Sequence, residues 1–483
     1  MKEYHLLQKA FEAEEFRKKG HDLVNQLADM LECVQRKEGN VTNPTPPNDL
    51  LHFWQNMEPM TTTDFFQKVM DQSIKIHHPR YTGHQVSAPL PISALSNLVT
   101  GLLNNGMGIY EMGEGATAIE KKVVEIFCTH LGFSEGDGIL TSGGTLANLT
   151  GLLAARAQYN GKHVWTEGTM EQYCIMVSEM AHYCVDRAVK IMGWGDEGII
   201  KVPVNKDYSM DVNALSGLLS KAQKQGKKVL AIVGSAPCTA TGSYDDLNAL
   251  ANFCQKENIW FHIDAAHGGP AIFSKKYKHL MNGADRADSV VIDAHKMMLT
   301  PALTTALLFK NASDSYNTFS QDAHYLWEGQ EDREWYNIAK RTFECTKVMM
   351  AVRVLTIINE YGINIFDDYV TRQYDLARNF AALIDDFDDF ELATLPDANI
   401  VCFRYICDAN NSDSLMLSKI NKKIRKSIFL KGKHYLVQTQ LHDGLYLRVT
   451  LMNALTTMED LTQMVEVIRK LGQEIIDIHR INK

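Results

Sequence analysis

The sequence lacks the features that mark secreted, membrane-spanning and zinc-finger proteins. Nine cysteines are scattered singly along 483 residues, and none forms a Cys-x-x-Cys pair. Such usage is typical of reduced thiols and argues against a disulfide framework. No stretch approaches the ~20 apolar residues of a membrane helix, and the charged N-terminus has no apolar signal-peptide core. We therefore expect a cytoplasmic protein with no membrane partner.

The chain also lacks an excess of positive charge. It carries 49 basic and 58 acidic residues, a net charge of −9, which gives no reason to expect a nucleic-acid partner. The basic run KKIRK at 422–426 is more typical of a solvated helix face than of a binding patch. What the chain does have is 45% hydrophobic residues, enough for a large core.

The pattern along the chain predicts three parts. Residues 1–85 have amphipathic helical spacing, interrupted by a proline-rich connector at 40–49. Residues 86–355 form a large central domain, and residues 356–483 a smaller α+β domain. Between about 138 and 310, strands alternate with long helices, which is typical of an α/β fold with a mainly parallel central sheet flanked by helices. Ligands of such sheets bind at the carboxyl ends of the strands.

Four polar groups directly follow the expected strands. They are the turn Ser142-Gly143-Gly144-Thr145, the imidazole of His182, Asp264 with the small residues Ala265 and Ala266 after it, and Lys296 in SVVIDAHKMM. Taken singly, the turn can be an ordinary helix start, His182 a structural residue and Asp264 a cap. Lys296 is unusual because it lies between apolar neighbours, although lysine is seldom buried.

Together these groups match the needs of pyridoxal 5′-phosphate. Glycine N–H groups at a helix N-terminus favour a phosphate, and an imidazole can stack on the ring. A carboxylate keeps the pyridine nitrogen protonated, and a lysine forms a Schiff base with the aldehyde. We expect burial to lower the pKa of Lys296 and so to leave more free amine.

Two other motifs are set aside. Residues 193–198 fit the pattern GxGxxG, but they follow a helix and precede a strand, the reverse of a dinucleotide site. His262, Asp264 and His267 could suggest a metal site, but no fourth ligand or helix-borne histidine pair accompanies them. We predict no metal.

Several segments resemble the group II pyridoxal-phosphate decarboxylases, which include glutamate, cysteine sulfinate, aromatic amino acid, histidine and 2,4-diaminobutyrate decarboxylases. The similarity runs from about residue 75 to 460, and its segments are HPRY (78–81), LTSGGTLANLT (140–150), SEMAHYCVDRA (178–188), WFHIDAAHGG (260–269), ADSVVIDAHKMM (287–298) and LRVTLMNALTT (447–457). The resemblance implies fold-type I, with an N-terminal helical segment that packs on a partner subunit. It also implies an obligate homodimer with active sites near the interface.

The resemblance also implies roles for single residues. Lys296 is implied to be the Schiff-base lysine, Asp264 the partner of the pyridinium and His182 the stacking imidazole. The remaining implied contacts are Ser142, Gly143, Gly144 and His295 at the phosphate, Ala266 against the ring, and Arg448 and Gln85 at the substrate.

The implied activity is α-decarboxylation of an L-amino acid to CO2 and an amine. The substrate stays open between 2,4-diaminobutyrate, an acidic and an aromatic amino acid. A decarboxylating aldehyde synthase of the same fold is an alternative, which ammonia and peroxide among the products would reveal. A non-catalytic dimeric binding protein is a further alternative, which a colourless purified protein would support.

This sequence departs from the family pattern at several positions. Asp293 stands where many relatives carry Asn, and a carboxylate near a phosphate is unfavourable unless it turns away or is protonated. Pro237-Cys238-Thr239 replaces a Gly-Thr-Thr stretch, and Ala302-Leu303-Thr304 weakens a glutamate assignment. In the short loop 319–342, Asp332 aligns with the tyrosine that reprotonates Cα, whereas Tyr325 and Tyr336 are out of register.

Overall fold

The computed structural model describes residues 5–160, 164, 167–169, 171–319, 334–406 and 413–481. The chain forms two compact units. The central unit comprises Gln85–Ile384 and Leu392–Cys402, and the terminal unit comprises Met1–His84, Asp385–Glu391 and Phe403–Lys483. The three-part division with boundaries near residues 85 and 355 stays a prediction. Within the described ranges, no helix is both long and apolar enough to cross a membrane.

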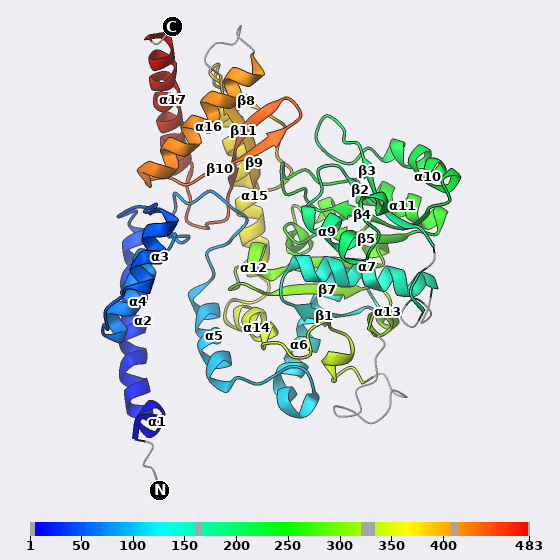
Figure 1. Cartoon of the computed structure of the whole chain (residues 1–483), viewed down its shortest axis with the longest axis horizontal. Helices are drawn as coiled ribbons and strands as arrows, with labels where there is room; N and C mark the ends of the chain where they lie inside the picture. Colours follow the sequence, from blue (N-terminus) through cyan, green and yellow to red (C-terminus); the bar gives the residue numbers. More distant parts are fainter. Residues whose placement is uncertain are drawn as a thin grey trace. The chain divides into compact units, whose positions relative to one another are not determined.

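The central unit is built on a seven-stranded sheet of order β1-β7-β6-β5-β4-β2-β3 (Figure 1). The strands are β1 (Asp137–Thr141), β2 (Tyr173–Ser178), β3 (Ile199–Val202), β4 (Lys228–Ser235), β5 (Trp260–Asp264), β6 (Ser289–Asp293) and β7 (Thr305–Phe309). The helices are α5 (Pro91–Leu103), α6 (Tyr110–Leu131), α7 (Gly144–Asn160), α9 (Tyr183–Ile191), α10 (Leu215–Lys224), α11 (Leu247–Glu257), α12 (Ala294–Met297), α13 (Ala312–Asn317), α14 (Met350–Tyr361) and α15 (Asn364–Asp385).

The direction of the strands brings the predicted groups to one edge of this sheet. Strands β2 to β6 pair in parallel, so their carboxyl ends lie together. Strand β7 runs antiparallel to both β6 and β1, and β1 therefore points the same way as the parallel strands. Thr305 pairs with both Thr141 and Asp293, which aligns the ends of β1 and β6. The predicted α/β class with a mainly parallel central sheet is confirmed.

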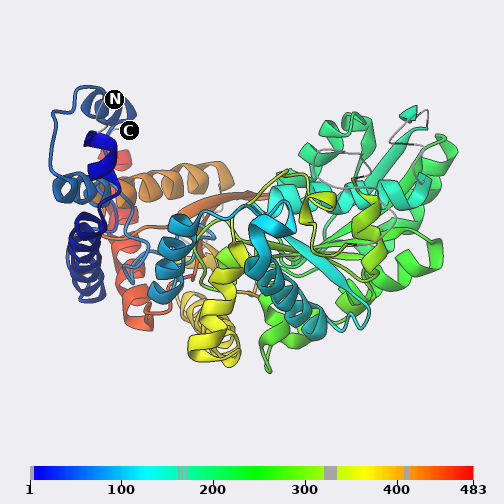
Figure 2. The same cartoon turned by 90° about the horizontal axis from the view of Figure 1, so that it is seen from below.

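Helix α7 crosses the sheet and contacts β1, β4, β5, β6 and β7 (Figure 1). Its apolar face joins a buried cluster with α9 and with inward-facing strand residues such as Ile175, Val233 and Leu307. At Gly151 the approach is close, because a Cβ there would lie 2.6 Å from the His262 ring. Helix α6 packs along β1 and β7 (Figure 2). These helices fix the turn between β1 and α7 at the carboxyl edge of the sheet.

The terminal unit combines the two ends of the chain. Its helices are α1 (His5–Ala10), α2 (Ala13–Gln35), α3 (Pro47–Gln55), α4 (Thr62–Asp71), α16 (Ser414–Lys431) and α17 (Met458–Ile481). A second sheet has the order β10-β11-β9-β8, with β8 (Phe390–Leu392), β9 (Ile400–Tyr405), β10 (Val437–Leu441) and β11 (Gly444–Thr450). Tyr81 and Tyr435 stack at 5.2 Å between ring centroids, which ties the N-terminal segment to the C-terminal one.

Candidate active site

A cavity of about 320 Å³ opens at the carboxyl edge of the central sheet. Every strand-end group predicted from the sequence lines this cavity, although the groups lie up to 154 residues apart (296 minus 142). The lining residues are Ser142, Gly143, Gly144, Thr145, Asn148, His182, Cys184, Ser235, Pro237, Thr239, Asp264, Ala266, His267, Asp293, His295, Lys296 and Leu303. The cavity is therefore the candidate active site.

Lys296 lies on the short helix α12, immediately after β6, and keeps 20% of its side-chain exposure. Its Nζ is 3.0 Å from Oδ2 of Asp293, which is almost fully buried. Burial alone lowers the pKa of Lys296, but the Asp293 and Asp264 carboxylates outweigh burial, and the net pKa lies above the ordinary value. The expectation of a lowered lysine pKa is therefore wrong for this structure, because the sequence did not reveal the ion pair.

The Asp293 carboxylate turns toward an ammonium group, a hydroxyl group and an imidazole ring. Thr305 Oγ1 donates to its Oδ1 at 2.5 Å, and Nε2 of His295 lies 3.6 Å from Oδ2. Burial alone would raise the pKa of Asp293, but Lys296 and His295 more than compensate, so the pKa lies below its usual value and the group stays ionised. A side chain at position 144 would crowd this carboxylate, since a Cβ on Gly144 would lie 3.0 Å from Oδ2.

Asp264 and His182 come from β5 and from the start of α9. The backbone N–H of Ala266 donates to Asp264 Oδ1 at 3.2 Å, and the Cys184 thiol lies 4.0 Å from Oδ2. His182 is the N-cap of α9, where its Nδ1 accepts from the Cys184 N–H at 3.3 Å. Burial lowers the pKa of His182, and the Asp264 carboxylate only partly offsets this effect. The imidazole is thus neutral at physiological pH.

The turn before α7 has the backbone conformation that the predicted anion cradle requires. Gly143 has φ +106°, a conformation that side chains rarely adopt, and α7 begins at Gly144. The first-turn N–H groups of a helix have no intrahelical acceptor and point toward an anion. The amine of Lys296, the Asp264 carboxylate and this cradle are the donor set that pyridoxal phosphate requires, and the small Ala266 leaves room for a flat ring.

Glu344 is a residue of the site that the sequence reasoning missed. Its Oε1 accepts from the Ser142 N–H at 3.1 Å and from the Ser142 hydroxyl at 2.8 Å, while Thr141 Oγ1 donates at 2.9 Å. Both Ser142 donors are thus held by a carboxylate, and the Gly143 N–H donates to the Thr141 carbonyl at 3.0 Å. A lone glutamate outside any motif gives no sequence signal for such a contact.

The two predicted substrate residues are not among the lining residues. Arg448 lies on β11 in the terminal unit and is 8% exposed. Gln85 belongs to the central unit, and its Nε2 is buried without a hydrogen-bond partner in the described ranges. The nearby Ser87 hydroxyl donates to the His295 carbonyl at 3.1 Å, which links this segment to the turn that carries Lys296.

The positions that depart from the family pattern lie in different places in the structure. Pro237, Thr239 and Leu303 line the cavity, whereas Cys238 is buried and its thiol donates to the Met180 carbonyl at 3.2 Å. Tyr336 packs edge-on against Tyr110 with 5.4 Å between ring centroids. Asp332 and Tyr325 lie outside the described residues.

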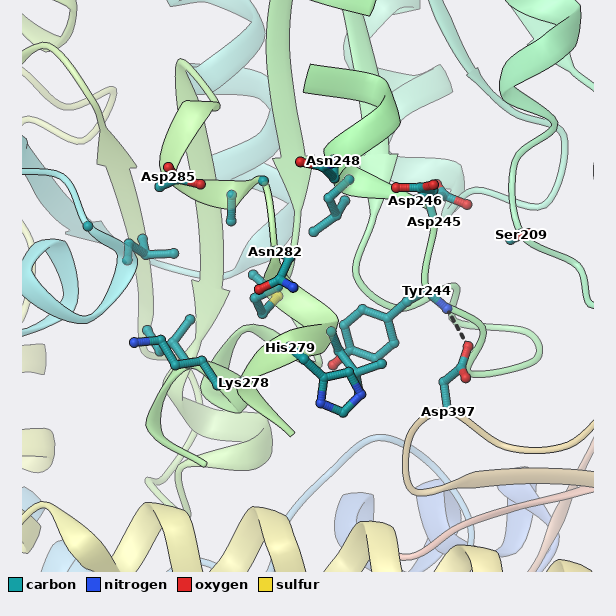
Figure 3. A pocket seen from close by; sticks show the side chains of 18 of the residues that line it. Ser209, Tyr244, Asp245, Asp246, Asn248, Lys278, His279, Asn282, Asp285 and Asp397 are labelled. Carbon is teal, nitrogen blue, oxygen red and sulfur yellow. Dashed lines mark hydrogen bonds between the residues drawn. The ribbon is translucent and has the colours of Figure 1, made fainter. Parts of the chain in front are cut away.

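A second cavity, of about 970 Å³, contains none of the predicted site residues (Figure 3). Several of its carboxylates serve the local fold. Asp397 accepts from the Tyr244 N–H at 3.1 Å, and Asp246 caps α11. Asp245 accepts from two backbone N–H groups at 2.7 Å, and burial raises its pKa to about 6. Within the part of the chain that the structure describes, no group of three His, Cys, Asp or Glu side chains could hold a metal.

Comparison with known proteins places this site in a family. The profile of the pyridoxal-dependent decarboxylase conserved domain matches residues 54–406. The aromatic-L-amino-acid decarboxylase of Bacillus atrophaeus is 27% identical, with 96% of each chain covered. The aspartate 1-decarboxylase of Aliivibrio fischeri is 30% identical over 85% of this chain and 82% of its own.

A solved structure gives the same assignment. The glutamate decarboxylase domain of diaminobutyrate-pyruvate transaminase and L-2,4-diaminobutyrate decarboxylase from Vibrio parahaemolyticus superimposes with a TM-score of 0.83 at 25% identity, covering 96% of both chains. The matched region includes the whole lining of the smaller cavity. The chain belongs to the pyridoxal-dependent decarboxylase family and is a carboxy-lyase that uses pyridoxal 5′-phosphate.

Proposed function

We propose that this enzyme is an L-amino-acid α-decarboxylase whose catalytic residues are Lys296, Asp264 and His182. The observation that carries the proposal is the convergence of an amine, a carboxylate and an imidazole on one cavity beside a helix N-terminus. Bound pyridoxal phosphate supplies a pyridinium ring that accepts the electron pair left when CO2 departs. Asp264 would hold the proton on the ring nitrogen, and His182 would pack on the ring face. Lys296 would hold the aldehyde carbon, and the N–H groups at the start of α7 would bind the phosphate.

We propose L-aspartate as the preferred substrate. The supporting observation is that the aspartate 1-decarboxylase of Aliivibrio fischeri is 30% identical over 85% of this chain. The roles of Arg448 and Gln85 as substrate contacts stay predictions.

A panel of L-amino acids tests the proposal. CO2 and amine should be released fastest from aspartate, and more slowly from glutamate, 2,4-diaminobutyrate, tyrosine and tryptophan. A preference for 2,4-diaminobutyrate or for an aromatic substrate would contradict the aspartate assignment and keep the reaction class. If the products are an aldehyde, ammonia and peroxide, the enzyme is an aldehyde synthase and not a simple decarboxylase.

Asp293 should control the pH at which the cofactor attaches to Lys296. Only the neutral amine adds to an aldehyde, and the Asp293 carboxylate helps to keep the pKa of Lys296 raised. In Asp293→Asn, only Asp264 remains to oppose the effect of burial, so the pKa of Lys296 falls. The pH midpoint of cofactor uptake by apoenzyme should move down by about one to three units. Absorbance during uptake measures this midpoint, and Asp285→Asn, an exposed carboxylate elsewhere in the central unit, is the control. An unchanged midpoint would refute the role of Asp293.

We also propose that the enzyme is a homodimer. Helix α5 exposes a stripe of large apolar side chains at helical spacing, formed by Leu95, Leu98, Val99, Leu102 and Leu103, each between 47% and 68% exposed. A contiguous apolar stripe of this kind is typical of a protein interface. Light scattering reports the mass directly, and a monomer mass of 54.5 kDa would contradict the proposal.

A further inference from the structure

A chain of buried hydrogen bonds runs beneath the cavity, from β5 and β6 to α7. The indole N–H of Trp260 donates to Ser289 Oγ at 2.9 Å, and Ser289 Oγ lies 2.7 Å from Nδ1 of His262. Nε2 of His262 is 2.8 Å from Oδ1 of Asn148 on α7. Ser289, His262 and Asn148 are each 0% exposed and Trp260 is 8% exposed, so these hydrogen bonds lie in the protein interior.

The Asn148 amide extends the chain to two parts of the site. Its Nδ2 donates to the Gly144 carbonyl at 2.8 Å, at the start of α7, and lies 3.5 Å from the Cys184 thiol. The thiol in turn is 4.0 Å from Oδ2 of Asp264. The buried chain therefore joins the anion cradle to the carboxylate that serves the cofactor ring.

The two ends of the chain fix the direction of every hydrogen bond. The Gly144 carbonyl can only accept, so the Asn148 NH2 group faces it and Oδ1 faces His262. Burial lowers the pKa of His262 to about 3, so the ring is neutral and its single proton is on Nε2. Nδ1 must then accept from the Ser289 hydroxyl, which agrees with the indole of Trp260, a group that can only donate.

The same logic orients the Cys184 thiol. Burial, followed by the nearby Asp264 carboxylate, raises the pKa of this thiol, which stays protonated. Because its sulfur accepts from Asn148, its hydrogen is directed at Asp264 Oδ2. The alternative that His262 is a metal ligand conflicts with this arrangement, since both of its ring nitrogens are already used.

We infer that His262 is a positioning residue for the cofactor site. Through Asn148 it holds the first peptide of α7 and the Cys184 thiol, and hence the anion cradle and the Asp264 carboxylate, at a fixed separation. Its ring fills the space under Gly151, where a Cβ would collide with it at 2.6 Å. The inference rests on the proposed roles of the cradle and Asp264, but its readout is cofactor affinity, which is independent of the substrate assignment.

The first test removes Ser289, which lies at the end of the hydrogen-bond chain remote from the cavity. Ser289 does not line the cavity, so Ser289→Ala removes the acceptor of Trp260 and the donor to His262 without touching the cofactor. Titration of apoenzyme with pyridoxal phosphate, well below the melting temperature, should show about 3- to 10-fold weaker binding, the size of one buried hydrogen bond. A lower melting temperature with unchanged affinity would overturn the inference, because the chain would then serve stability alone.

A matched pair at Cys184 decides the question even if Ser289→Ala does not fold. Cys184→Ala breaks the connection between Asn148 and Asp264, whereas Cys184→Ser keeps a donor and acceptor of similar size. We expect weaker cofactor binding, and an altered pH dependence of the bound-cofactor absorbance, in the Ala variant and recovery in the Ser variant. Cys254→Ala is the control, because Cys254 is a buried cysteine on α11 that takes no part in this chain of hydrogen bonds. Equal affinity in both Cys184 variants and the parent protein would overturn the inference.

Discussion

The variant Asp264→Asn is expected to lose about 10²- to 10⁴-fold in kcat. Asp264 would form an ion pair with the cofactor pyridinium inside the cavity. Removing one partner of such a desolvated pair costs about 3–5 kcal/mol, and each 1.36 kcal/mol corresponds to a factor of ten in rate. Asparagine can contact the ring nitrogen but carries no charge to hold a proton there. Because Asp264 would act on the charged form of the ring rather than on cofactor uptake, kcat should fall far more than cofactor affinity.

Steady-state kinetics with saturating cofactor, together with apoenzyme titration, separate the two effects. Asp288→Asn is a matched control, because Asp288 is also a half-buried carboxylate that accepts from a backbone N–H, in its case that of Phe261. It lies just before β6, at the end of the strand remote from Asp293. Unchanged turnover in Asp264→Asn with equal cofactor binding would remove Asp264 from the catalytic residues.

The convergence of the strand-end groups was predictable because it follows from the topology of the sheet. Once the alternation of strands and helices indicates a parallel sheet, residues that follow different strands must meet at one edge. Ser142, His182, Asp264 and Lys296 line one cavity for that reason. The sequence did not reveal that β7 runs antiparallel to both β6 and β1. Because β1 and β6 both run opposite to β7, they point the same way, and the end of β1 lies at the same edge.

The electrostatics of the site could not be predicted in the same way. The pKa of Lys296 depends on a 3.0 Å contact with Asp293, and sequence spacing alone does not say whether the carboxylate turns toward the lysine or away. Glu344 reaches Ser142 across 202 positions (344 minus 142). His262 and Asn148 lie in recognisable motifs, yet their hydrogen bond depends on the packing of α7 over β5. Contacts between side chains of distant segments require the folded structure.

Lys296→Ala should have the largest effect of all. A tethered amine acts at an effective concentration of about 10⁵ M or more relative to a free amine. Its loss should therefore lower the decarboxylation rate by more than about 10⁴-fold, and borohydride should no longer trap the cofactor on the protein. Mass spectrometry after reduction measures the trapping, and Lys310→Ala, an exposed lysine just after β7, should retain both trapping and activity.

Lys296→Ala also separates covalent attachment of the cofactor from its reversible binding. The N–H groups at the start of α7, Asp264 and His182 are untouched, so reversible cofactor binding should persist in Lys296→Ala. The loss of Lys296 also leaves Asp293 without its nearest cation, and a buried unpaired carboxylate close to the cradle disfavours a phosphate. The double variant Lys296→Ala, Asp293→Asn should therefore bind the cofactor more tightly than Lys296→Ala alone. Weaker binding in the double variant would mean that Asp293 contributes to the phosphate site by a route other than its charge.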